Sequence, residues 1–340
     1  MKRLPKITAH ERMDFKRCEM KWFWHWRKGL RPKAISFGAL ELGTWVHLAF
    51  EHWYQKGRRR DGSLPEWFAQ FADEAIQEAL AAGAPDHAIE QAEELLALGE
   101  LMMKAYETRY GLDSDVIVLS VEIPLDFLIP SWATEEIIAV HKLRPDMVFM
   151  DGNGDVWLME HKTAKTISTT HLPIDDQARP YGAMAEPALR KAGVINRRHR
   201  FRGIMYNFVR KSLPDDRPED AQGRKLNLNG TLSKRQPSPQ FVRHAVTLSK
   251  QAKLVTLNRV RTETQIIAQL GDALRSGEIT RAVLKKTPHK SCVHFCPFFD
   301  MCVADENGAD IRMMEKAMYR KENPYLYQET AAEYAGFEMG

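Results

Sequence analysis

Three charged side chains lie on two predicted strands in the middle of the chain. Asp146 is on the first strand, and Glu160 and Lys162 are on the second. Residues two apart on a strand face the same side, so Glu160 and Lys162 project together from an otherwise apolar segment. Burying such charges costs free energy unless partners compensate them. Mg²⁺ or Mn²⁺ bound by the two carboxylates would do so, and Lys162 could then orient a water or offset charge on a phosphate.

The same pattern allows a plainer interpretation, in which Glu160 and Lys162 form a salt bridge at a strand end and Asp146 only ends a turn. A predicted helix over residues 37–56 adds context, because His47 and Glu51 are four residues apart and share one helix face. Most of their neighbours on this helix are apolar. A lone histidine in that setting is usually a core residue, but here it would supply a further arm for the same metal.

The elements that must position these residues follow from hydrophobic periodicity and turn signals. Helices are expected over residues 9–28, 37–56, 64–82, 86–110, 174–192 and 249–275. Strands are expected over residues 116–129, 136–150 (bent at Pro145), 156–163, 201–210 and 241–248. Residues 151–154 form a tight-turn sequence, which joins the second and third strands in a hairpin. The third strand is apolar on both faces, so it should be central.

This pattern predicts one α/β domain over residues 1–340 with four parts. A helical part covers 1–111, a sheet core covers 112–210, a proline-containing mobile loop covers 211–240, and a second helical part covers 241–340. The aromatic side chains of the first helix are expected in the core. Two arginine clusters, at 58–60 and 197–202, could contact DNA phosphates or could be ordinary solvated surface.

Composition excludes several classes of protein. The chain has 340 residues, a net charge of +4, 28% charged residues and 44% hydrophobic residues, which is typical of a folded protein. We find no apolar run of the roughly 18 residues that a membrane span needs, and no apolar stretch follows the basic N-terminus. A cytoplasmic location is therefore expected, where thiols stay reduced and cysteines are more often ligands than disulfide partners.

The four cysteines form a plausible ligand set. Cys18 is near the N-terminus, and Cys292, Cys296 and Cys302 are close together near the C-terminus. Four thiolates suit either zinc or an iron–sulfur cluster. The three residues between Cys292 and Cys296 fit a zinc ribbon poorly, since ribbons favour two. Four unrelated buried thiols are the alternative.

Three segments resemble motifs of the RecB-type nucleases in the PD-(D/E)XK superfamily. Gly43–Glu51 is similar to Gly-x-x-x-His-x-x-x-Glu, Arg144–Asp146 with Met159–Thr163 resembles the strands that give the superfamily its name, and Gln177–Tyr181 resembles Gln-x-x-x-Tyr. The resemblance implies a restriction-endonuclease-like core, with a central mixed sheet flanked by helices. It also implies metal ligation by His47, Asp146, Glu160 and the backbone carbonyl of His161, a catalytic Lys162, and supporting or DNA-contacting roles for Glu51, Gln177 and Tyr181.

Pro180 interrupts the last of these motifs. Proline disfavours helical backbone at Arg179, the residue before it, but Gln177 and Tyr181 can still share a face if Pro180 lies in the first turn of the helix.

The cysteine segments resemble those of iron–sulfur RecB-type nucleases. Phe15–Phe23 is similar to their N-terminal cysteine motif, and Ser291–Cys302 is similar to their C-terminal group of three. The resemblance implies a 4Fe-4S cluster that joins the two terminal helical parts. AddB-type helicase–nucleases, CRISPR-adaptation nucleases and phage stand-alone exonucleases share this arrangement, and the segment around Cys296 and Cys302 is most similar to the phage proteins.

Together these features predict an Mg²⁺- or Mn²⁺-dependent deoxyribonuclease, with an exonuclease favoured, acting in recombination, repair or phage DNA processing in the cytoplasm of a cell or a phage host. One alternative is a non-catalytic DNA-end-binding or adaptation-complex module of the same fold. Another is a zinc-stapled protein without a nucleic-acid role. DNA is the expected partner, no membrane is expected, and a homo-oligomer or recombination and adaptation partner proteins are left open.

Overall fold

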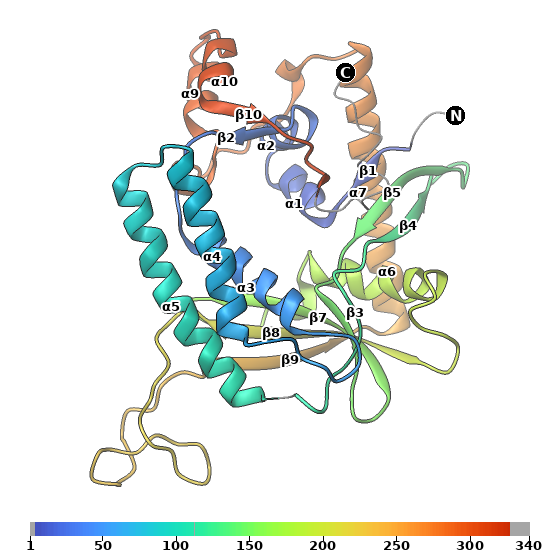
Figure 1. Ribbon diagram of the computed structural model, residues 1–340. Helices are drawn as coiled ribbons and strands as arrows, with labels where there is room; N and C mark the ends of the chain where they lie inside the picture. Colours follow the sequence, from blue (N-terminus) through green and yellow to red (C-terminus); the bar gives the residue numbers. More distant parts are fainter. Residues whose placement is uncertain (1–3, 112, 327–340) are drawn as a thin grey trace.

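A five-stranded mixed sheet forms the centre of the computed structural model, which describes residues 4–111 and 113–326 (Figure 1). Its strand order is β3-β6-β7-β8-β9, and β7 and β8 are its parallel pair. β7 lies in the middle, and its first seven residues are buried, as its apolar sequence predicts. The strands are β3 (Ile117–Val121), β6 (Met147–Met150), β7 (Asp155–Ala164), β8 (Arg200–Arg210) and β9 (Phe241–Thr247).

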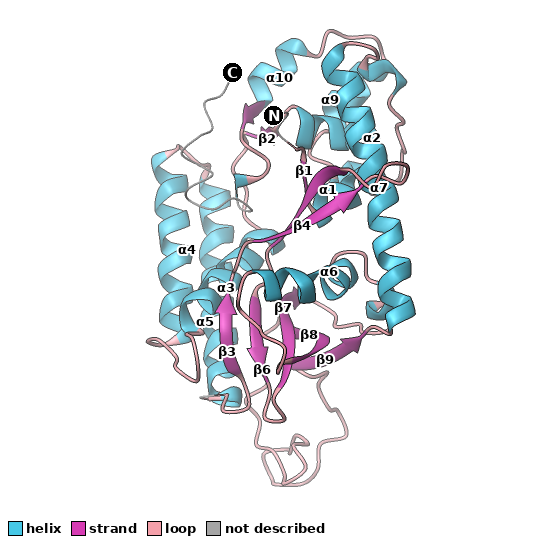
Figure 2. Cartoon of the chain, turned by 90° about the vertical axis from the view of Figure 1, so that its right-hand side faces the viewer, coloured by secondary structure: helices cyan, strands magenta, loops and turns pink. Residues whose placement is uncertain are grey.

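Helices cover both faces of this sheet. One face packs against α3 (Ala39–Trp53), α4 (Leu64–Ala81) and α5 (Asp86–Tyr110), and the other packs mainly against α6 (Ala178–Lys191) and α7 (Lys250–Ser276). Alternate residues of β7 serve the two cores, because Trp157 and Met159 belong to the first and Leu158 to the second. The expected mixed sheet flanked by helices is therefore confirmed, and α3 and α6 lie at the same end of it (Figure 2).

Two of the expected strands are each divided between two sheets. Residues 116–129 form β3 and β4 (Leu125–Pro130), and residues 136–150 form β5 (Ile137–Leu143) and β6. β4 and β5 pair with each other and with β1 (Lys6–Ile7) in a separate sheet. The uninterrupted strands were wrong because Pro124 and Pro145, which cannot donate to a ladder, lie at the two crossings. The β6–β7 hairpin through residues 151–154 is confirmed, with Gly154 at φ +79°.

The first predicted helix is also broken. It divides into α1 (Ala9–Arg17), α2 (Glu19–Trp22) and a π-helical turn over Phe23–Arg27, because Cys18 has an extended backbone with φ −165° and ψ 115°. The long-helix prediction failed because this local break at Cys18 leaves no trace in the hydrophobic pattern. The expected core position of the aromatic side chains is confirmed for Phe15, Trp22, Trp24 and Trp26.

The two ends of the described chain lie side by side at the top of Figure 1. β10 (Tyr319–Lys321) pairs with β2 (Leu30–Pro32), and the short helices α8 (Cys292–Phe295), α9 (Phe299–Glu306) and α10 (Arg312–Met318) lead to it. The buried Glu11 carboxylate accepts hydrogen bonds from Trp22 Nε1 and Tyr325 Oη and pairs with Arg27. The chain termini are therefore joined by contacts that do not involve cysteine. The remainder of the expected helical tail, residues 327–340, lies outside the described residues.

The other segments are close to expectation. Ser249 caps α7 by accepting a hydrogen bond from the Ala252 N–H, and two short 3-10 helices span Leu172–Ile174 (η2) and Arg281–Val283 (η3). Residues 211–240 contain no named helix or strand and project from the sheet edge (Figure 1), with isolated bridges at Glu219–Lys225 and Leu226–Leu232. Within the described ranges, no helix is long and apolar enough to cross a membrane.

Candidate metal centre

His47 and Asp146 meet where α3 crosses the end of the central sheet. Gly43 allows this crossing, because a Cβ there would lie 3.3 Å from the Thr163 Oγ1 of β7. One helical turn later, His47 projects from α3 toward the β5–β6 crossing, and its Nδ1 lies 3.5 Å from Asp146 Oδ1. The predicted neighbours are thus brought together across about 100 residues of sequence.

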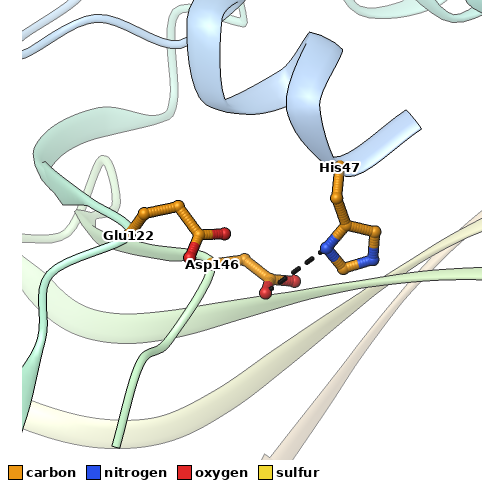
Figure 3. A group of neighbouring side chains, drawn as sticks. All are labelled: His47, Glu122 and Asp146. Atoms are coloured by element: carbon orange, nitrogen blue, oxygen red, sulfur yellow. Dashed lines mark ion pairs between the residues drawn. The ribbon is translucent and has the colours of Figure 1, made fainter. Parts of the chain in front are cut away.

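Glu122 is the third member of this group, and the sequence reasoning missed it. Suitable ligand atoms of His47, Glu122 and Asp146 all lie within 4.8 Å of one another (Figure 3). Glu122 occupies the crossing from β3 to β4 with a left-handed φ of +46°, and its N–H donates to the Asp146 carbonyl at 3.0 Å. The available signal was weak, because Glu122 is one of two acidic residues, with Asp126, in a largely apolar strand-like run.

The backbone of His161 fixes the second oxygen of Asp146. The His161 N–H donates to Asp146 Oδ2 at 2.6 Å. By strand alternation, the His161 side chain points away from Glu160 and toward α3, where its ring stacks on Phe50 with centroids 4.3 Å apart. The carboxylate is therefore oriented before any ligand binds.

Glu160 and Lys162 lie on the α6 side of β7 and are joined by Gln177. The Lys162 Nζ donates to Glu160 Oε1 at 2.7 Å and to Gln177 Oε1 at 2.8 Å, and Gln177 Nε2 donates to the same Glu160 oxygen at 3.0 Å. Gln177 immediately precedes α6, and Asp175 accepts hydrogen bonds from the N–H groups of residues 177 and 178. Pro180 is the third residue of α6, so it lies in the first turn and leaves the motif intact.

Arg144 connects the remaining predicted residues to Glu122. Its Nε donates to Glu122 Oε2 at 2.8 Å, while its second arm lies 3.8 Å from the Glu51 carboxylate. The Arg144 backbone N–H donates to the buried Tyr181 hydroxyl at 3.4 Å. Glu51 and Tyr181 therefore contact Arg144, which lies between them and the Glu122 carboxylate.

Electrostatics separates the roles of these groups. Burial alone would lower the pKa of His47, but the Asp146 carboxylate raises it to about 9. Burial alone would raise the pKa of Asp146, but His47 lowers it to about 2. Burial raises the pKa of Glu160. Burial alone would lower the pKa of Lys162, but the Glu160 carboxylate raises it above its usual value. Burial lowers the pKa of His161 to about 3, so this ring is neutral.

The His47–Asp146 pair predicts a pH-dependent stability in the metal-free protein. Because folding raises the pKa of His47 from 6.5 to about 9, its stabilisation is fully present below pH 6.5 and is lost as the pH rises to about 9. In EDTA, the difference in unfolding free energy between the unsubstituted protein and His47→Gln should shrink across this window in urea titrations. A difference that stays constant or grows would contradict the assigned pair.

The four cysteines are half-buried free thiols where the two chain ends meet. Arg17 bonds the Ser291 hydroxyl, and the Lys285 N–H donates to the Glu19 carboxylate, so the neighbours of Cys18 contact the segment leading to Cys292. Burial first, and then the nearby Cys292 and Cys18 thiols, raise the pKa of Cys296.

The described thiols include no group of three that is as close together as the ligands of one zinc ion. Across the described residues, which include every cysteine, no three thiol sulfurs lie within 4.8 Å of one another. Bonds of 2.3 Å to a tetrahedral zinc would place the sulfurs about 3.8 Å apart.

The arginine clusters have structural partners. Arg200 and Arg202 pair with Asp155, which is five residues from Glu160 and thus about 16 Å away along β7. Arg60 stacks over the Trp53 and Tyr54 rings, and Arg58 donates to the Ser114 carbonyl. These contacts favour the plainer interpretation for the four arginines that make them.

Comparison with known proteins agrees with this geometry. The family model described as the PD-(D/E)XK nuclease superfamily matches residues 7–303, which include every residue of the metal centre and all four cysteines. A search of curated proteins finds no match.

Proposed function

We propose, because this chain belongs to the PD-(D/E)XK nuclease superfamily, that its metal centre hydrolyses phosphodiester bonds of DNA. One observation carries the proposal: ligand atoms of His47, Glu122 and Asp146 lie within 4.8 Å of one another. The Glu160–Lys162 pair lies in β7 on either side of His161, whose backbone N–H binds Asp146. A fold kept only for binding would have no need for three converging ligands beside a charged lysine.

The residues present suit a hard divalent cation. Carboxylate oxygens of Asp146 and Glu122 are the ligands that Mg²⁺ and Mn²⁺ prefer. His47, protonated at neutral pH without metal because of Asp146, would add a nitrogen once a cation displaces its proton. Glu160 is the further candidate, because both of its hydrogen bonds use Oε1. A bound cation supplies Lewis-acid activation of water and of a phosphoryl oxygen. Mn²⁺ binding to the Glu122→Gln protein distinguishes Glu122 from Glu160 as the third ligand.

Lys162 is assigned to charge stabilisation and positioning. Its raised pKa keeps the ammonium group protonated at neutral pH, so it does not accept the proton of an attacking water. A fixed ammonium group beside the site can instead orient that water and stabilise negative charge that develops on the phosphate. Gln177 holds the ammonium group in place from the first turn of α6.

Glu122 is expected to contribute directly to metal binding. Glu122→Gln removes one negatively charged ligand and the ion pair that Glu122 makes with Arg144, so Mn²⁺ affinity should fall by at least about tenfold in a titration followed by electron paramagnetic resonance. Asp126→Asn is the matched control, because Asp126 is an ion-paired carboxylate on the adjacent strand β4 that pairs with Lys142. Equal Mn²⁺ affinities for Glu122→Gln and the unsubstituted protein would assign the third ligand to Glu160.

The finer proposal is an exonuclease that acts on DNA ends. It is supported by the similarity of the Cys292–Cys302 segment to phage stand-alone exonucleases. Labelled linear and closed-circular DNA should be compared with Mg²⁺, with Mn²⁺ and with EDTA. Degradation of linear DNA alone, abolished by EDTA, is expected. Cleavage of both forms would indicate an endonuclease, and binding without cleavage would indicate the non-catalytic DNA-end module.

We also propose that the thiols hold a 4Fe-4S cluster. The proposal is supported by the meeting of four cysteines from both ends of the chain, where Cys18 and Cys292 lie near Cys296. It is also supported by the resemblance of Phe15–Phe23 and Ser291–Cys302 to the cysteine segments of iron–sulfur RecB-type nucleases. Bound there, the cluster would link α2 to α8 and α9 in a structural role.

A further inference from the structure

A chain of hydrogen-bonded polar side chains runs through the protein interior behind the metal centre. Apart from the half-buried Arg243, its members are buried. They come from the residue directly after α3, from α5 and the segment after it, and from β7, β8 and β9. No role in the proposed chemistry has yet been assigned to most of them. We call this set the polar chain, and its members are Tyr54, Tyr106, Asp113, His161, Asn207 and Arg243.

The outer part of the polar chain is a fixed anchor. Arg243 on β9 donates to both oxygens of Asp113, at 2.9 and 2.6 Å, and to the Tyr106 hydroxyl at 2.9 Å. Its guanidinium group also stacks on the Tyr110 ring, 4.0 Å from the centroid. The Tyr54 hydroxyl donates to Asp113 at 3.0 Å. A bidentate pair of this kind holds both partners in one geometry.

The anchor sets the orientation of the Asn207 amide. Arg243 has no acceptor, so the Asn207 oxygen must face its Nε, and these atoms are 3.3 Å apart. The amide nitrogen then faces the Tyr106 hydroxyl and His161 Nδ1, each at 2.9 Å. Because an amide nitrogen only donates, His161 Nδ1 must accept, and the proton of the neutral ring lies on Nε2.

His161 contacts two residues of the metal centre, Asp146 and His47. Its backbone N–H orients Asp146 Oδ2, and its ring meets the His47 ring edge to face, with centroids 6.0 Å apart. We propose that Arg243 and Asn207 are positioning residues, which fix the tautomer and ring orientation of His161 and thereby hold Asp146 and His47 for metal binding. The inference rests on the proposed metal centre and not on DNA cleavage.

Mn²⁺ binding to the full chain tests the proposal. Asn207→Leu roughly keeps the volume of the side chain but removes its three hydrogen bonds, so the Mn²⁺ dissociation constant should rise by about 10-fold to 100-fold, as for other residues that orient metal ligands. Glu11→Gln is the matched control, because Glu11 is fully buried and its partners Trp22, Arg27 and Tyr325 all lie in the terminal segments. It should lower the melting temperature and leave Mn²⁺ affinity unchanged.

A second variant keeps the proposal testable if Asn207→Leu does not fold. Asn207→Asp has nearly the same shape but cannot donate, so His161 should move its proton from Nε2 to Nδ1. Nitrogen-15 NMR of the labelled His161 ring reports this exchange directly, and Mn²⁺ affinity should fall together with it.

Three results would overturn the inference. The first is a lowered melting temperature in both Asn207 variants with unchanged Mn²⁺ affinity, since the polar chain would then be structural only. The second is a proton on His161 Nδ1 in the unsubstituted protein. The third is an absence of Mn²⁺ binding, which would remove the metal centre as well. Metal binding without DNA cleavage would overturn the nuclease proposal and leave this inference standing.

Discussion

Lys162→Ala is expected to reduce metal-dependent DNA hydrolysis by about 10²- to 10³-fold, the usual effect of removing one group that stabilises transition-state charge. The ammonium group is held between Glu160 and Gln177, at 2.7 and 2.8 Å, so it is already placed when substrate arrives. Rates should be measured on labelled linear DNA at saturating Mg²⁺, so that weaker metal binding is not mistaken for a slower chemical step.

Two controls separate catalysis from folding in this experiment. Lys162→Met retains much of the aliphatic stem and should be as inactive as Lys162→Ala while melting close to the unsubstituted protein. Lys165→Ala removes an exposed lysine three residues away, just after β7, and should retain full activity. If either Lys162 variant degrades DNA at the unsubstituted rate, the charge-stabilising role is wrong.

Cys296→Ala is expected to remove the visible absorption near roughly 400 nm and to destabilise the protein at the same time. A group bound by Cys18 and the three C-terminal cysteines would close a loop of more than 270 residues. The neighbouring residues Arg17 and Ser291, which are hydrogen-bonded, are 274 positions apart. The chain-entropy estimate for a cross-link of this length is about 4–5 kcal/mol, an upper value here because the β2–β10 pairing and the Glu11 contacts also join the ends. Urea unfolding and absorption spectra measure the two effects.

A double substitution tests whether the cysteines act together. If Cys18 and Cys296 bind one cluster, Cys18→Ala combined with Cys296→Ala should destabilise the protein no more than either change alone. Additive losses would show four independent thiols. A soluble, colourless and fully active Cys296→Ala protein would contradict the cluster, and zinc in the purified protein without visible absorption would replace it with a zinc site.

Much of the fold was predictable because long elements carry their own periodicity. The positions of α4, α5 and α7 follow from their apolar stripes and caps, and the central place of β7 follows from its two apolar faces. The crossings between sheets were not predictable, because Pro124 and Pro145 signal an interruption of a strand but not a change of sheet. Whether such a strand continues or changes sheet depends on the partners it finds in three dimensions.

The candidate site also contains residues that the sequence predicted and residues that only the structure identified. The sequence by itself predicted Asp146, Glu160, Lys162 and His47. Strand alternation places Glu160 and Lys162 on one face, and the resemblance to the nuclease motifs assigns all four to one metal centre. Only the tertiary structure brings Glu122 close to His47 and Asp146, and only it sets the contacts of Gln177 and of the polar chain behind His161. These contacts join residues far apart in sequence, and their geometry arises from how α3, α6 and the strand crossings pack. Periodicity reports the face on which a side chain lies, but packing alone sets which faces meet.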